Sequence, residues 1–244
     1  MKKKLVLAIM TITLVAAMVS GASYSWYTDS ASVGPNIFTA AELLVTEDMV
    51  LWLDASTLNL ENEESVSLWK DKSAYSNDAT APSGFQPIYI SSVPGLDSKP
   101  AIRFNGTSYF DLGDPEILRF TSSVTAFFVA KRESDGRLLS KVTLNRATYY
   151  DYHEGKLRYD IAPDSGSLVG VMSDNQVGSD YNIIAFTYNA TAQNIILHLN
   201  RILAGFTDEG VPTSQYNSNN ANWNIGRDSR NEVYLKGDIA EIII

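Results

Sequence analysis

The sequence of 244 residues contains no cysteine. This absence excludes a disulfide framework, a thiolate metal site and a cysteine nucleophile. Histidine is also scarce, with only His153 and His198. His198 alternates with Leu197 and Leu199 in a strand-like run, so we expect it at the surface or in a groove rather than as a metal ligand. No nucleophile-elbow motif accompanies either histidine, which leaves a Ser-His-Asp site without support.

A long apolar run occurs only at the start of the chain. Lysines at 2–4 precede the apolar residues 5–19, and the small residues SGA follow at 20–22. The run is short for a membrane span but has the length and flanks of a secretory signal peptide. We predict that residues 1–22 are removed, that no stable membrane span remains, and that the protein is secreted or held at the cell surface. An uncleaved N-terminal anchor is the alternative.

Basic residues are outnumbered, with 19 Lys and Arg against 28 Asp and Glu and a net charge of −9. Loss of the three signal-peptide lysines makes the net charge −12. An acidic chain repels phosphate backbones, so we expect no nucleic-acid partner. Hydrophobic residues make up 45% of the chain, which indicates a packed core rather than disorder.

A distinctive segment follows the predicted cleavage site. Tyr24, Trp26 and Tyr27 come first, and the run NIFTA follows at 36–40. This arrangement resembles the corresponding segment of precursors with a SipW-dependent-type signal peptide, a group that includes camelysin-like proteins and biofilm matrix subunits. The resemblance implies an export route, and we assign residues 23–47 to a linker ahead of the main domain.

From residue 49 onward, short apolar runs alternate with turn clusters, and no run of ten residues has clean helical periodicity. Strands at intervals of about 8–12 residues favour an all-β sandwich. The run LHLNRILAGF at 197–206 predicts a hairpin that turns at Asn200 and Arg201, loosened because arginine is disfavoured at positive φ. The predicted strands are residues 50–54, 66–70, 88–91, 101–104, 109–112, 124–131, 138–142, 149–153, 157–160, 183–188, 195–199 and 202–206.

Five short blocks carry a family resemblance. They are LWLDAS at 51–56, WKDKS at 69–73, PAIRFNG at 100–106, WNIGR at 223–227 and GDIAEI at 237–242. Together they resemble strands of the laminin-G-like, concanavalin A-like jelly-roll domains of secreted proteins. Such domains mostly bind glycans or other surface ligands, and only some relatives are enzymes.

The resemblance covers residues 48–244. It implies an all-β jelly-roll β-sandwich of two antiparallel sheets in a single domain. Relatives continue past the last block into a polar segment, whereas this chain stops at Ile244 within an apolar run. We therefore expect that a C-terminal region is missing.

The acidic motif of the enzymatic relatives is absent. Jelly-roll glucanases of similar fold carry Glu-x-Asp-x-x-Glu on one strand, where alternate acids converge on the sugar. Residues 61–64 hold three glutamates but have the composition of a loop, and GDIAEI holds Asp238 and Glu241 without reproducing the motif. Because no strand supplies an obvious pair of catalytic carboxyl groups, we predict that the protein is not an enzyme.

Calcium binding is possible but not predicted at a particular site, since the EF-hand pattern is absent. Acidic and amide side chains in turns equally serve as turn caps, and this role is favoured here. Trp52 and Trp69 are predicted to be core residues. The residues considered as calcium ligands are Asp71, Asn77, Asp78, Asp160, Asp164 and Asp174.

Aromatic rings and amides are the groups that bind sugars. Tyr149, Tyr150 and Tyr152 form the densest cluster, and alternation places Tyr150 and Tyr152 on one face of a strand and Tyr149 on the other. Asn222 and Trp223 end an amide-rich loop that also holds Asn217, Asn219 and Asn220. We predict ligand contacts from Tyr149, Tyr150, Tyr152, Asn222 and Trp223. The alternative is that Trp223 and one or two tyrosines belong to the core.

The predicted function is therefore non-catalytic recognition at the cell surface or in the extracellular matrix, with a carbohydrate as ligand. A structural role in a biofilm matrix or fibre is the alternative, and glycoside hydrolysis is a third, disfavoured possibility. The sequence leaves the identity of the ligand and the oligomeric state open.

Overall fold

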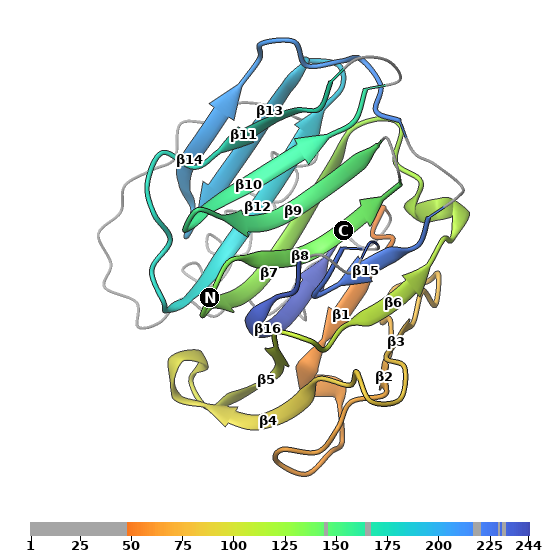
Figure 1. The fold of residues 1–244 in the computed structure, drawn as a ribbon, viewed down its shortest axis with the longest axis vertical. Helices are drawn as coiled ribbons and strands as arrows, with labels where there is room; N and C mark the ends of the chain where they lie inside the picture. Colours follow the sequence, from red (N-terminus) through yellow and green to blue (C-terminus); the bar gives the residue numbers. More distant parts are fainter. Residues whose placement is uncertain (1–47, 144–145, 164–166, 217–220, 229, 231–232) are drawn as a thin grey trace, which may run out of the picture.

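The computed structural model describes residues 48–143, 146–163, 167–216, 221–228, 230 and 233–244. The predicted signal peptide and linker lie outside these residues, as do Asn217, Asn219, Asn220 and Asp164. The described chain is built almost entirely of strands (Figure 1). The strands are β1 (Trp52–Asp54), β2 (Leu68–Trp69), β3 (Ala79–Thr80), β4 (Ile88–Val93), β5 (Lys99–Asn105), β6 (Phe110–Gly113), β7 (Val124–Arg132), β8 (Gly136–Val142), β9 (Ala147–His153), β10 (Lys156–Ile161), β11 (Val169–Met172), β12 (Tyr181–Asn189), β13 (Asn194–Leu199), β14 (Ile202–Thr207), β15 (Trp223–Ile225) and β16 (Lys236–Ile243).

Within the described ranges, three single-turn 3-10 helices interrupt the strands: η2 (Ala55–Thr57), η3 (Pro94–Leu96) and η4 (Glu116–Leu118). Helix η2 begins because the Asp54 side chain accepts a hydrogen bond from the Ser56 amide, 2.8 Å away. These turns are too short to change the fold class.

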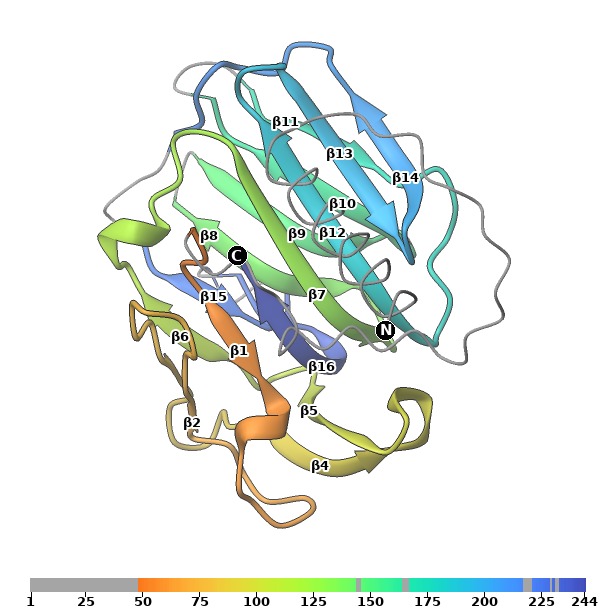
Figure 2. The same ribbon diagram turned by 180° about the vertical axis from the view of Figure 1, so that it is seen from behind.

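Two antiparallel sheets form a sandwich, which confirms the predicted all-β architecture. Sheet A has the order β14-β13-β12-β7-β16-β5-β4, with β1 paired to β16. Sheet B has the order β11-β10-β9-β8-β15-β6-β3-β2. Sheet B faces the viewer in Figure 1, and sheet A faces the viewer in Figure 2.

The core lies between the sheets and is rich in aromatic side chains. Phe128 and Phe186 of sheet A meet Tyr150 of sheet B at ring-centroid distances of 6.1 and 5.4 Å. Trp69 packs on Phe110 at 5.8 Å. Each fully buried side chain of this size contributes about 1.5–3 kcal/mol through burial of apolar surface. This core explains how the domain forms without disulfides.

Strand β7 has one buried face and one half-buried face. Ala126, Phe128 and Ala130 are buried in the core, whereas Phe127 and Val129 are half-buried on the outer face of sheet A. Trp69 is a core residue as predicted. The prediction for Trp52 is wrong, because Leu53 takes the inward position of β1 and leaves Trp52 half-buried on the outer face.

The β13–β14 hairpin is tighter than predicted. Asn200 and Arg201 both have positive φ, at 50° and 70°. This is the backbone of a type I′ turn, which matches the twist of the two strands. The Asn200 side chain stabilises the turn, because its Oδ1 accepts a hydrogen bond from the Ile183 amide and its Nδ2 donates to Asn182.

The WKDKS block forms a clamp, as predicted for a turn. One carboxylate, that of Asp71, accepts hydrogen bonds from the backbone amides of Trp52, Ser73 and Asn77, each at 2.8 Å. The Ser73 hydroxyl donates to the same carboxylate at 2.6 Å. The clamp therefore joins the first strand to the loop after β2.

Candidate functional site

Strand β9 places the predicted tyrosines on opposite faces, as alternation requires. Tyr150 and Tyr152 point into the core and are 0% and 1% exposed. Tyr150 stacks on Tyr159 with 4.5 Å between ring centroids, and their hydroxyls lie 3.1 Å apart. Burial raises the pKa of both Tyr150 and Tyr152 well above the usual range. The ligand contacts predicted for these two rings do not fit the structure, because neither ring has an open face.

Trp223 is also a core residue. It is 1% exposed, and its indole Nε1 donates a hydrogen bond to the Leu118 carbonyl at 2.9 Å. Its ring packs against Phe120 and Tyr150. A sugar cannot stack on it, so the predicted contact from Trp223 does not fit its position either. Its role is to anchor η4 beside β15.

Tyr149 is the outward tyrosine, but two arginines cover it. The guanidinium carbons of Arg137 and Arg158 lie 3.9 and 5.2 Å from its ring centroid. The ring is 7% exposed. Asp151 contacts both arginines, and it is opposite Arg137 and Arg158 in the strand register. These cross-strand ion pairs hold the outer face of β8, β9 and β10 together.

The strand register places polar side chains in one line across the outer face of sheet B. We call this line the sheet B row. Arg227 covers the middle of the row. Its Nε donates a hydrogen bond to the side-chain oxygen of Asn224 at 3.0 Å, and its backbone carbonyl accepts one from the Ser140 hydroxyl at 2.9 Å. The members of the row, each opposite the next, are Thr80, Asp111, Asn224, Ser140, Tyr149 and Asp160.

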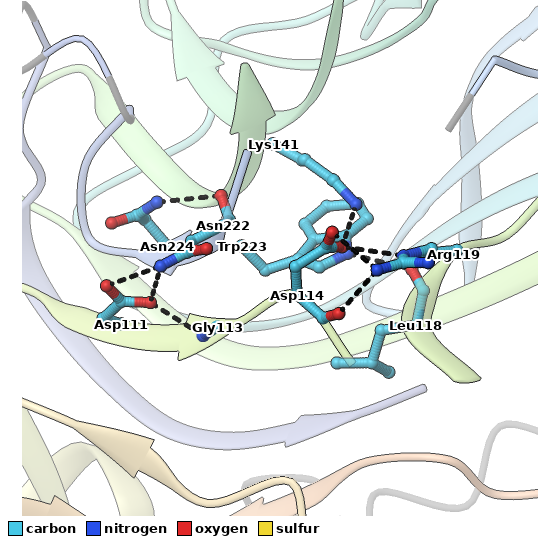
Figure 3. Close-up of polar contacts among 9 residues, drawn as sticks. All are labelled: Asp111, Gly113, Asp114, Leu118, Arg119, Lys141, Asn222, Trp223 and Asn224. Atoms are coloured by element: carbon cyan, nitrogen blue, oxygen red, sulfur yellow. Dashed lines mark hydrogen bonds and ion pairs between the residues drawn. The ribbon is translucent and has the colours of Figure 1, made fainter. Parts of the chain in front are cut away.

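The open end of the row holds a carboxylate and an amide in direct contact (Figure 3). Asn222 is exposed, and its Nδ2 lies 3.0 Å from each carboxylate oxygen of Asp111. The Gly113 amide also donates to Asp111, at 2.7 Å. Asp111 points outward because its neighbours Phe110 and Leu112 fill the core. We call Asp111, Gly113 and Asn222 the Asp111–Asn222 site.

A cation pair borders this site. Lys141 and Arg119 both bind the Asp114 carboxylate, at 2.5 and 2.9 Å (Figure 3). Burial alone would raise the pKa of Asp114, but the hydrogen bonds from Arg119 and Lys141 outweigh burial and lower it. Burial lowers the pKa of Lys141, which is 5% exposed. These contacts hold the β6–β7 loop to β8.

An exposed ring adjoins the same face through a chain of contacts. Arg227 lies 3.3 Å from the ring centroid of Tyr109, and the Tyr109 ring packs on Phe85 at 5.4 Å. Phe85 is 43% exposed. Unlike the predicted tyrosines, Phe85 therefore has the exposure that stacking on a sugar requires.

Three of the candidate calcium ligands, Asp71, Asp78 and Asp160, are engaged in other contacts. In the described part of the chain, no group of three or more His, Asp or Glu side chains could hold a metal ion. Asp71 instead forms the clamp described above, and Asp78 accepts a hydrogen bond from the Asp71 amide at 2.9 Å. Asp160 lies beside Arg158 at 3.4 Å, and burial raises its pKa.

Among the described residues, no helix has both the length and the apolar character needed to cross a membrane.

The sequence offered a signal for part of the site. The run FDL at 110–112 places an acid between two apolar residues, which identifies Asp111 as an outward acid of a half-buried strand. Asn222 was predicted from composition. Arg119 is five residues from Asp114 in the same loop, whereas Lys141 comes from β8 and reaches Asp114 only in the packed sheet.

No family model matches this chain, and no curated protein matches it. Solved structures do match. Domain 4 of AbnA, a GH43 extracellular arabinanase from Geobacillus stearothermophilus solved in complex with arabinotriose, is 14% identical with a TM-score of 0.59, over 80% of this chain and 90% of that domain.

Two toxin domains are also similar. The botulinum neurotoxin serotype G binding domain is 10% identical with a TM-score of 0.57, over 80% of this chain and 47% of that one. The binding domain of Paraclostridial Mosquitocidal Protein 1 is 17% identical with a TM-score of 0.55, over 81% of this chain and 49% of that one. This chain thus spans about half the length of the toxin domains. At such identities the likeness shows a shared fold, the two-sheet β-sandwich.

Proposed function

We propose that this chain is a non-catalytic recognition domain that binds carbohydrate at the Asp111–Asn222 site on the outer face of sheet B. One observation carries the proposal. An outward carboxylate and an exposed amide lie 3.0 Å apart, at the open end of the sheet B row. Sugar hydroxyls both donate and accept hydrogen bonds, and a carboxylate beside an amide supplies acceptors and donors within one short span.

The neighbouring groups add to this chemistry. Phe85 presents an exposed ring for the apolar face of a sugar, and Lys141 and Arg119 hold the adjoining loop rigid. A rigid, preformed site loses less entropy when it binds. The arabinotriose complex of the AbnA domain supports a carbohydrate ligand for this fold.

Export and family membership belong to the same proposal. The signal-like residues 1–22 support secretion or display at the cell surface, and the five blocks quoted above support a laminin-G-like domain over residues 48–244. An extracellular location would give the site access to glycans of cell walls, matrices or host surfaces.

A glycan array tests the binding proposal. We expect the unaltered chain to bind one or more glycans, and Asp111→Ala and Asn222→Ala to weaken that binding at least tenfold. Asp208→Asn is the matched control, because Asp208 is exposed and lies beyond β14 on the other sheet. Equal binding by all variants would refute the site, and absence of any glycan ligand would refute the function.

A structural role is the second candidate, and one observation favours it. Ile202, Leu203 and Phe206 are 71%, 58% and 49% exposed on β14, the edge strand of sheet A. Exposed apolar edge strands promote association between chains. Sedimentation that depends on protein concentration in the absence of glycan, and that Leu203→Lys abolishes, would support a matrix component.

A further inference from the structure

The first and last strands of the described chain bring two acids together on sheet A. Strand β1 pairs antiparallel with β16, and Asp54 lies opposite Glu241. Both side chains are on the outer face, because Leu53 and Ile242 fill the core. Asp54 is 9% exposed and Glu241 is 8% exposed. The sequence offered no acid pair on one strand, and this pair arises instead from two strands far apart in the chain.

The two carboxyl groups have unequal partners. Asp54 accepts a hydrogen bond from the Ser56 amide at 2.8 Å and binds the Lys72 ammonium at 2.9 Å. Glu241 accepts one hydrogen bond from the neutral indole Nε1 of Trp52, at 2.9 Å. The same Lys72 ammonium lies 3.6 Å from the Trp52 ring centroid. Asp54 therefore has a cation in direct contact, whereas Glu241 has only a neutral donor.

The remaining groups around the pair do not change this difference between the two carboxyl groups. Lys72 and Lys99 favour the charged form of Glu241 from a distance, and Asp54 opposes it. Strand β7 presents the neutral Val129 opposite Glu241. Burial, and after it the Asp54 charge, raises the pKa of Tyr89, so Tyr89 stays neutral.

Electrostatics then assign one proton to the pair. Burial is the largest cause that raises the pKa of Glu241 to about 7, and the Asp54 charge raises it further against the Trp52 hydrogen bond. Burial would also raise the pKa of Asp54, but its hydrogen bonds with Ser56 and Lys72 outweigh burial and lower it. Just below neutral pH, Asp54 is ionised and Glu241 keeps its proton.

We propose that Asp54 and Glu241 form a proton-dependent clasp between β1 and β16. While Glu241 keeps its proton, the strands stay paired. Loss of that proton to solvent leaves two buried negative charges side by side with one lysine in contact, which loosens β1. Like charges confined to one buried site disfavour double ionisation. The clasp lies on sheet A and is independent of the Asp111–Asn222 site on sheet B.

The sign of the pH effect follows from linkage. The pKa of Glu241 is higher in the folded chain, at about 7, than its ordinary value of 4.5. The clasp therefore stabilises the fold fully below pH 4.5 and loses its contribution as the pH rises toward 7. A difference of this size changes the folding equilibrium constant by up to roughly 300-fold.

The indole N–H resonance of Trp52 tests the clasp directly, because this group donates to Glu241. Nuclear magnetic resonance of the whole chain between pH 5 and 8.5, with the resonance assigned through Trp52→Phe, follows the ionisation. We expect a titration near pH 7 that Asp54→Asn moves to lower pH and Glu241→Gln removes. Glu116→Gln, at an exposed position, is the control and should leave the titration unchanged.

Unfolding measured over the same pH range gives the second readout. We expect the unfolding midpoint of the unaltered chain to fall as the pH rises, relative to that of Glu241→Gln. A Trp52 resonance that stays constant from pH 5 to 8.5 overturns the proposal, as does a pH dependence that Glu241→Gln retains. The resonance is read on the unaltered chain, so that result stands even when a variant fails to fold.

Discussion

At the scale of single residues, burial decides which aromatic side chains can meet a ligand. Tyr150 and Tyr152 share a face, as the sequence predicts, but that face points into the core. Alternation identifies the two faces of a strand and does not say which one is inward when both carry aromatic rings. Tyr149 shows a second limit of prediction from one strand. It lies on the outer face, but arginines from the neighbouring strands β8 and β10 cover its ring.

Tyr150→Ala should destabilise the domain severely. Removal of a fully buried ring that packs on Tyr159 and Phe186 should cost about 3–5 kcal/mol of unfolding free energy. Chemical denaturation measures this loss. Tyr75→Ala is the control, because Tyr75 is 45% exposed and its loss should change stability by no more than about 0.5 kcal/mol. Similar costs for the two variants would contradict the assignment of Tyr150 to the core.

Phe85→Ala should behave in the opposite way. We expect a loss of about 1–3 kcal/mol in glycan binding, the scale of stacking between an aromatic ring and a flat ligand, with little change in the thermal midpoint. Phe206→Ala removes a ring of comparable exposure from sheet A and should leave binding unchanged. Titration calorimetry with a glycan selected on the array distinguishes the two variants. Equal effects on binding would remove Phe85 from the site.

At the scale of elements, the sequence predicts strands well where apolar residues alternate over five residues or more. Strands β7, β12 and β13 lie where they were expected. Strand β3 was missed because it has only two residues, and β11 was missed because Gly170 interrupts its apolar run. Of the site, only Asn222 and the alternation at Asp111 were visible. The contact of Lys141 with Asp114 depends on strand register, which a single sequence does not specify.

Asp71→Ala tests how β1 is held to the rest of the domain. The substitution leaves the backbone amides of Trp52, Ser73 and Asn77 without their acceptor. Hydrogen bonds to a charged group contribute about 1.5–3 kcal/mol each, so we expect a loss of at least about 2 kcal/mol in unfolding free energy. Asp97→Ala is unsuitable as a control because Asp97 has positive φ, so exposed Asp208→Ala is used. A loss below about 0.5 kcal/mol would show that β1 does not depend on the clamp.

At the scale of the whole molecule, the two sheets have different outer faces. Sheet B carries the polar row with ion pairs, whereas sheet A carries half-buried apolar side chains such as Phe127 and Val129 and the exposed edge of β14. We therefore propose that glycan recognition takes place on sheet B. The clasp and any self-association are assigned to sheet A, and the two functions are separable by substitution.

The most direct test of the account maps a bound glycan on the unaltered chain by nuclear magnetic resonance. Addition of a glycan selected on the array should shift the backbone amide of Gly113 and the side-chain amide of Asn222, and should leave β13 and β14 unchanged. This result would place the ligand on the outer face of sheet B. Shifts confined to sheet A, or no shifts with any glycan, would contradict the central claim.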